Sequence, residues 1–224
     1  YQLNRNEDWI GRRLVTNKIA EGRVFLAGDA AHIWVPMGGY GMNAGIADAA
    51  GLTWLIDARL KGWGGSGLLA AYAAERLTIT RQVSHFAMET AETMIRNRAA
   101  VPEEIEDDTP AGLAAQNWFG AQSSDLNMPQ YCCAGLNYGY YYDDSPVIIY
   151  DNMQQPSYSM ADYTPSTVPG CRFAHIVMAD GTSIYDHLGP GYTLVRTLAG
   201  KGATIIEAAN HLDIPLAIID IPAS

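Results

Sequence analysis

Residues 22–60 read GRVFLAGDAAHIWVPMGGYGMNAGIADAAGLTWLIDARL, and this stretch decides the fold. It opens with an apolar run at 24–27, which is typical of a strand buried on both faces. A glycine and an aspartate end the run at 28–29, and a glycine-rich loop follows at 36–41. Residues 43–60 then show the spacing of a helix. This order of elements within one short stretch is more specific than any of its parts.

The first polar feature of the stretch is Asp29. A carboxylate at the carboxyl end of an inner strand occupies the edge where ligands bind in open α/β sheets. Such a group can accept hydrogen bonds from sugar-type hydroxyls. Taken alone, Asp29 also fits a turn or helix cap.

The second feature is the loop that leads into the helix. Gly38, Gly39, Gly41 and Gly45 carry no side chain, so backbone N–H groups can approach a ligand closely, and Pro36 stiffens the entrance. The helix dipole favours electron-rich or anionic groups at this end. A glycine-rich loop by itself is equally compatible with a tight turn.

These residues resemble a known family. GRVFLAGDAAH followed by PxGGxGMNxGxxDAxxLxWxL is similar to the second FAD signature of class A flavoprotein monooxygenases, the aromatic hydroxylases related to para-hydroxybenzoate and phenol hydroxylase. The match is dense over residues 23–60. It implies an α/β fold in which residues 1–101 form the C-terminal part of a Rossmann-like FAD-binding domain with a long helix.

The resemblance also implies a cofactor site. Asp29 would bind the ribityl chain of FAD, and Pro36 would lie by the isoalloxazine. The expected cofactor-binding residues are Gly28, Asp29, Pro36, Gly38, Gly39, Gly41, Met42 and Asn43. His32 is expected to be a hydrogen-bonded structural residue rather than a partner of the flavin. Trp34 departs from the polar or small residue expected there. No catalytic residue and no metal ligand is assigned.

By the same resemblance, the parent protein would hydroxylate a phenolic or other aromatic substrate with FAD, NAD(P)H and O2. In this family the ADP half of FAD is held by a GxGxxG motif in a strand–turn–helix, and no such motif occurs in the chain: the GxGxxG spacing at 62–67 follows a predicted helix and no strand. We therefore expect a C-terminal fragment that is inactive alone. The alternatives are a flavin-dependent halogenase or reductase of related fold, or a non-catalytic dimerisation or interaction fragment.

Beyond residue 60, we expect a helix at 67–98 with Ser66 as its N-cap. Its apolar stripe comprises Leu69, Tyr72, Arg76, Ile79, Val83, Phe86, Thr90 and Met94. An acidic run at 102–112 indicates a boundary, so residues 102–168 are expected to be a linker and an irregular aromatic segment, with a strand at 147–150.

The last segment, 169–224, has the pattern of a small α/β module. Strands are expected at 173–178, 192–197 and 216–221, with a helix at 204–212. The segment resembles the thioredoxin-like domain of phenol hydroxylase and the polyketide hydroxylases, and we expect it to be truncated at the end of the sequence. It lacks the redox cysteine pair, which implies a structural or dimer-forming role, with Cys171 inert.

Composition narrows the function classes. The formal net charge of the 224 residues is -10, which argues against nucleic acid and against an anionic membrane as partners. The three cysteines form no disulfide framework, so a cytoplasmic setting is expected. The expected partners are a small aromatic substrate, O2, and either a second copy of the chain or the missing N-terminal half.

Overall fold

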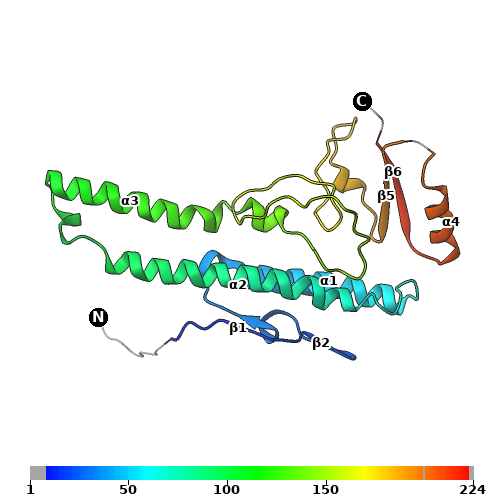
Figure 1. The fold of residues 1–224 in the computed structure, drawn as a ribbon, viewed down its shortest axis with the longest axis horizontal. Coiled ribbons are helices and arrows are strands. Elements are labelled where there is room, and N and C mark those ends of the chain that lie inside the picture. The colour runs from blue at the N-terminus through cyan, green and yellow to red at the C-terminus, as the bar shows by residue number, and fades with distance from the viewer. Residues whose placement is uncertain (1–8, 199, 222–224) are drawn as a thin grey trace.

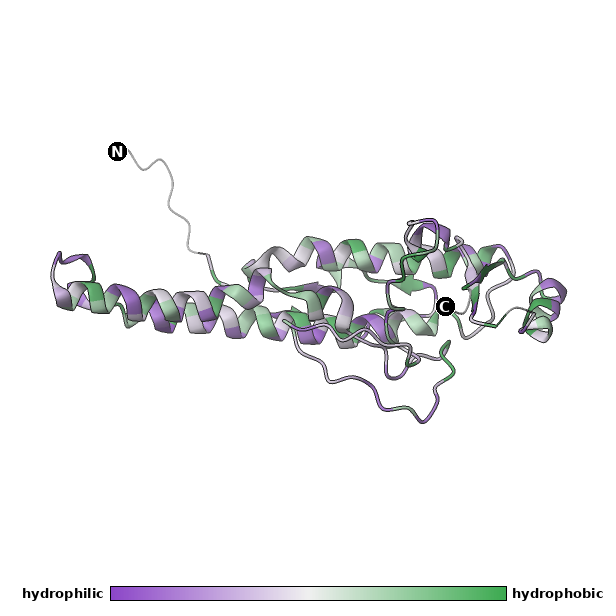
Figure 2. Ribbon diagram, turned by 90° about the horizontal axis from the view of Figure 1, so that it is seen from above, coloured by the Kyte–Doolittle hydropathy of each residue, from purple (hydrophilic) through white to green (hydrophobic). Residues whose placement is uncertain are grey.

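The computed structural model describes residues 9–198 and 200–221. Its dominant elements are three long helices, which give the molecule an elongated shape (Figure 1). They are α1 (Tyr40–Leu60), α2 (Ala70–Ala99) and α3 (Pro110–Tyr131). A short 3-10 turn, η3 (Glu103–Glu106), joins α2 to α3, so these two helices form a hairpin. Seen from above, α1 lies alongside only part of that hairpin, and the rest projects beyond it (Figure 2).

Two short antiparallel strand pairs precede the helices. β1 (Leu14–Val15) pairs with β4 (His32–Ile33), and β2 (Ala20–Glu21) pairs with β3 (Val24–Phe25). Between β3 and β4 lies the 3-10 turn η1 (Gly28–Ala30), which packs against α1. The strands therefore hold the turn at the side of the helix.

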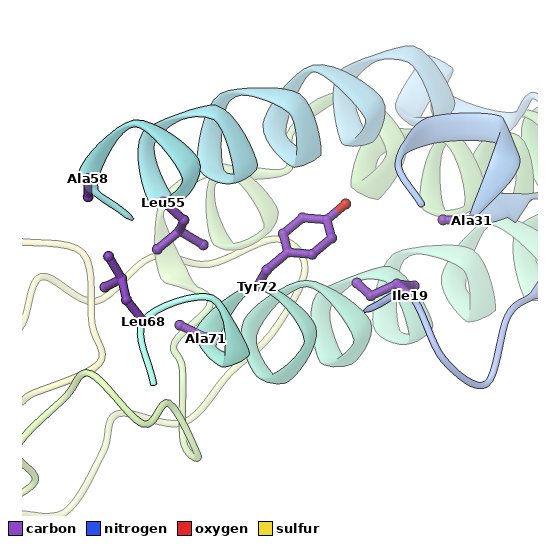
Figure 3. Packing of buried hydrophobic residues seen from close by; sticks show 7 residues of the cluster. All are labelled: Ile19, Ala31, Leu55, Ala58, Leu68, Ala71 and Tyr72. Atoms are coloured by element: carbon purple, nitrogen blue, oxygen red, sulfur yellow. The ribbon is translucent and has the colours of Figure 1, made fainter. Parts of the chain in front are cut away.

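One hydrophobic core lies between α1 and α2. Leu55 and Ala58 of α1 face Ala71 and Tyr72 of α2, and Ile19 of the strand region closes one end (Figure 3). The Tyr72 ring is 1% exposed, and its hydroxyl donates a hydrogen bond to the Leu26 carbonyl at 2.7 Å. Because this bond satisfies the buried hydroxyl, Tyr72 ties the strand region to α2.

A second core joins the glycine-rich loop to α2 and to the end of α3. Val35 and Tyr40 pack with Ile79 and Val83 of α2, and Cys133 lies on the same cluster. The Tyr40 hydroxyl donates to the Gln130 carbonyl at 2.7 Å. The start of α1 is therefore fixed against both other helices.

The C-terminal module contains β5 (Tyr192–Arg196), α4 (Ala203–His211) and β6 (Leu216–Asp220), with β5 and β6 parallel. This β-α-β order was predicted from the sequence and is confirmed. An aromatic cluster joins the module to α1: the ring centroids of Trp54 and Tyr192 are 5.7 Å apart, and the Trp54 indole donates to the Pro190 carbonyl at 2.9 Å.

Two predictions about the first hundred residues are wrong. The strand at 24–27 is only two residues long, and Val24 is 64% exposed, because the described residues supply a single partner strand and cannot cover both faces. Ser66 does not cap α2, which begins at Ala70 after Leu69 without a side-chain cap. The apolar stripe predicted for this helix is confirmed: each of its residues is buried or half-buried.

A linker and irregular structure were also predicted for 102–168, and this is wrong for residues 110–131, which form α3. The Thr109 side chain accepts a hydrogen bond from the Gly112 amide, and Pro110 occupies the first turn, where a missing N–H is harmless. The strands predicted at 147–150 and 173–178 are absent from the described structure, apart from an isolated bridge between Val177 and Ser183. Among the described residues, no helix combines the length and apolarity needed to cross a membrane.

Candidate cofactor loop and adjoining cavities

The turn η1 lies very close to α1. Gly28 has φ +57°, and a Cβ added to Gly45 would lie 3.3 Å from the Gly28 Cα. A larger residue at Gly45 would therefore push the turn away from the helix. Asp29, inside this turn, is exposed, so its carboxylate is available to a ligand.

The start of α1 is built from glycines in left-handed conformations. Gly38 and Gly39 have φ values of +66° and +71°, which side-chain-bearing residues rarely adopt. No side chain caps the helix, and Met42 in its first turn is 73% exposed. The first turn of the helix is therefore open to an electron-rich group.

A buried carboxylate links this loop to α2. Asp48 is 1% exposed, and its Oδ2 accepts hydrogen bonds from the Gly28 amide at 3.1 Å and from His32 Nε2 at 2.7 Å. Its Oδ1 accepts from Arg76 Nε at 2.8 Å. Burial raises the pKa of Asp48, but the hydrogen bonds from His32, Arg76 and Gly28 bring it below its usual value. The carboxylate is therefore ionised and fully partnered.

His32 is 4% exposed and stacks on Trp34, with ring centroids 4.9 Å apart. Its Nε2 lies against the ionised Asp48, so the proton belongs on that nitrogen. Its Nδ1 is buried and has no hydrogen-bond partner among the described residues. His32 therefore contacts Asp48 through Nε2 and Trp34 through its ring face. The prediction that His32 is hydrogen-bonded is confirmed.

Two cavities lie on the other side of α1. The first has a volume of about 400 Å³ and lies between the glycine-rich loop, α2 and the segment after α3. Gly38, Asn43 and Tyr140 line it. The second, of about 190 Å³, is lined by Trp54 and Tyr142 among others. Ala47 and Arg76 line both, so the cavities adjoin there. The larger one has the size of a small-molecule site.

The structure thus places Gly28 and Asp29 beside α1, and places Gly38 and Asn43 at a cavity wall. Sequence analysis did not identify Asp48 as a site residue. A detectable signal existed: Asp48 interrupts an apolar stretch of its helix, Arg76 falls on the mostly apolar stripe of the next, and opposite charges in two packed helices indicate a buried pair.

Known proteins are similar to the chain in sequence. Residues 2–87 match the FAD binding domain model. The chain is 31% identical to the FAD-dependent monooxygenase opdD of Penicillium oxalicum, over 89% of this chain and 39% of that protein. It is also 31% identical to aklavinone 12-hydroxylase RdmE of Streptomyces purpurascens, over 95% of this chain and 35% of that protein.

Solved structures agree. The flavin-dependent monooxygenase PieE, in complex with FAD and substrate, superposes with a TM-score of 0.82 at 26% identity, over 96% of this chain and 41% of that one. RebC, a rebeccamycin biosynthetic enzyme with reduced flavin, superposes with a TM-score of 0.81 at 29% identity, over 93% of this chain and 39% of that one. The chain spans about two fifths of the length of these relatives.

The residues present are compatible with part of an FAD site. Gly28 and Gly45 approach each other closely because neither carries a side chain, the start of α1 is uncapped, and Asp29 is exposed beside them. Together with the match to the FAD binding domain model and the two superpositions, these features show that the chain has the fold of the corresponding part of class A FAD-dependent monooxygenases and is similar to them in sequence.

Proposed function

We propose that the whole protein containing this chain is an FAD-dependent monooxygenase that hydroxylates an aromatic ring, with NAD(P)H as reductant and O2 as oxidant. The observation that carries the proposal is the uncapped, glycine-built start of α1 next to the Asp29 turn, in a chain similar to this family. FAD, when bound and reduced, supplies the oxygen activation.

In this proposal the chain holds one flank of FAD. Asp29 accepts hydrogen bonds from the ribityl hydroxyls, and Pro36 lies by the flavin ring. The backbone amides of 41–43 donate to the electron-rich end of the ring, where the helix dipole adds to their effect. The full set is Gly28, Asp29, Pro36, Gly38, Gly39, Gly41, Met42 and Asn43.

The aromatic substrate would occupy the larger cavity. Two observations support this assignment: Gly38 and Asn43 of the proposed cofactor loop form part of its wall, and the side chains of Tyr40 and Tyr140 supply aromatic surface. The walls would position the ring and exclude water. The C-terminal module would serve a structural or dimer-forming role of thioredoxin-like type.

The test is to purify the whole protein and measure bound FAD, then follow NADH and NADPH oxidation with phenolic substrates under labelled O2. We expect about one FAD per chain and one labelled oxygen atom in a hydroxylated product. A flavin-loaded protein that halogenates or only reduces its substrate would favour the related flavoenzymes. A protein that cannot bind FAD would favour the interaction-fragment alternative.

A further inference from the structure

The two cavities adjoin at Arg76, a buried cation that uses only some of its N–H groups in hydrogen bonds. Arg76 is 6% exposed and lines both cavities. Its Nε donates to Asp48 at 2.8 Å. Among the residues that the structure describes, the bond from Nε to Asp48 is the one hydrogen bond of good geometry that Arg76 donates, and the Tyr142 phenol also lies within hydrogen-bonding reach of the guanidinium. A guanidinium carries five N–H donors, so most of them remain available.

The surroundings of Arg76 determine what can bind there. Asp48 neutralises the guanidinium, so the pair carries no net charge. Glu75, the preceding residue of α2, lines the second cavity and accepts a hydrogen bond from Ser145 Oγ at 2.6 Å. A second carboxyl group nearby disfavours an anionic ligand. Because this site offers N–H donors but carries no net positive charge, it favours a ligand with an uncharged oxygen acceptor.

The shape of the site points to a planar ligand. On α1, small residues line the cavities: Ala47 lines both, and Gly51, one turn further on, lines the second. Tyr140 lines the first cavity and Tyr142 the second, and their ring centroids are 5.8 Å apart. A lining of small residues and aromatic rings suits a flat aromatic ligand.

We propose that Arg76 is a specificity-determining residue that binds an uncharged carbonyl oxygen of a planar aromatic ligand spanning the two cavities. This inference rests on the proposed function for the identity of the larger cavity as the substrate site. In this proposal the terminal nitrogens of Arg76 donate hydrogen bonds to the carbonyl oxygen of the ligand, while Nε continues to donate to Asp48.

The test uses the whole protein and three probes: xanthone, xanthene with the same rings but no carbonyl, and a xanthene carboxylate. Dissociation constants are measured by equilibrium dialysis for wild type, Arg76→Lys and Arg98→Lys. Lysine keeps a cation for Asp48 but loses the planar fork of donors. Arg98 is an exposed residue near the end of the same helix and provides the matched control.

We expect wild type and Arg98→Lys to prefer xanthone over xanthene by about tenfold or more, and Arg76→Lys to lose most of that preference. The ratio of the xanthone and xanthene dissociation constants is compared between variants, so the difference in hydrophobicity between the two probes cancels. Equal affinity for xanthone and xanthene in wild type would overturn the inference, as would an unchanged ratio in a folded Arg76→Lys. Tightest binding of the carboxylate would overturn the choice of an uncharged acceptor.

If Arg76→Lys does not fold, the infrared carbonyl stretch of xanthone bound to wild type decides. A shift to lower frequency than in an apolar solvent is expected, and an unshifted band contradicts the inference. FAD absorbance is recorded on the same samples. Loss of flavin with a retained xanthone preference would count against the proposed function alone, whereas a flavin-loaded protein without the preference would count against the Arg76 inference alone.

Discussion

Replacing Asp48 by Asn should destabilise the protein more than any other single polar change in the described residues. Asp48 accepts three hydrogen bonds, from Gly28, His32 and Arg76, and is 1% exposed. Asparagine has one acceptor oxygen, and its amide group would face N–H donors. The change also leaves the Arg76 guanidinium buried without its counter-ion.

The expected loss follows from that arrangement. Removing one partner of a buried ion pair costs about 3–5 kcal/mol, so we expect about 3 kcal/mol because asparagine retains one acceptor. The stability of a typical domain is only about 5–15 kcal/mol. The Gly28 amide also loses its anchor, so FAD retention should fall together with stability.

The assay is urea unfolding of the whole protein, followed by circular dichroism and by flavin release. Asp57→Asn on the same helix is the matched control, because Asp57 pairs with Lys61 at 2.9 Å in an exposed i,i+4 geometry. Such exposed pairs contribute about 0–1 kcal/mol. If the free energy of unfolding of Asp48→Asn lies within about 1 kcal/mol of that of the control, Asp48 does not stabilise the contact between the Gly28 turn, α1 and α2 as described.

Four further predictions concern neighbouring features. Folding lowers the pKa of Asp48, so its carboxylate stabilises the fold fully above the usual carboxyl pKa, and this stabilisation is lost as pH falls through the folded-state pKa. The free energy of unfolding of wild type should therefore fall more steeply in acid than that of Asp48→Asn. Gly38→Ala should lower the thermal midpoint and FAD occupancy, since φ is +66° and a Cβ would clash with the Tyr40 ring; Gly41→Ala, with no atom within 4 Å, should not lower the midpoint. Tyr72→Phe should cost about 1 kcal/mol in urea unfolding by leaving the Leu26 carbonyl without its donor. Trp54→Phe removes the bond to Pro190 but keeps an aromatic ring, so proteolysis after residue 169 should quicken while unfolding of the helices stays unchanged.

The predictions from the sequence are correct for elements whose structure is determined by a local sequence pattern. Apolar residues recur every three or four positions between Leu69 and Met94, and this stripe is buried in the structure. The glycine-rich loop could be predicted because few other residues tolerate the φ values found at Gly38 and Gly39. The β-α-β order near the C-terminus also follows local pattern.

The failures involve structure that depends on distant contacts. α3 contains Gly112, Gly120 and Pro129, which weaken its helical pattern, and it is held by its Thr109 cap and by packing against η3 and α2. In α1, Ile46 and Leu60 are exposed although both are apolar, while the buried face includes Asp48 and Leu55. Which face of an apolar helix is covered depends on its partners.

The claim that the Asp29 turn and the start of α1 hold FAD is tested most directly by FAD affinity. The dissociation constant of the whole apoprotein is measured by flavin fluorescence for wild type, Asp29→Ala and the exposed control Asp57→Ala. Loss of hydrogen bonds to a charged acceptor predicts weakening by about tenfold to a hundredfold for Asp29→Ala, with the control unchanged. Equal affinity in all three proteins would contradict the account.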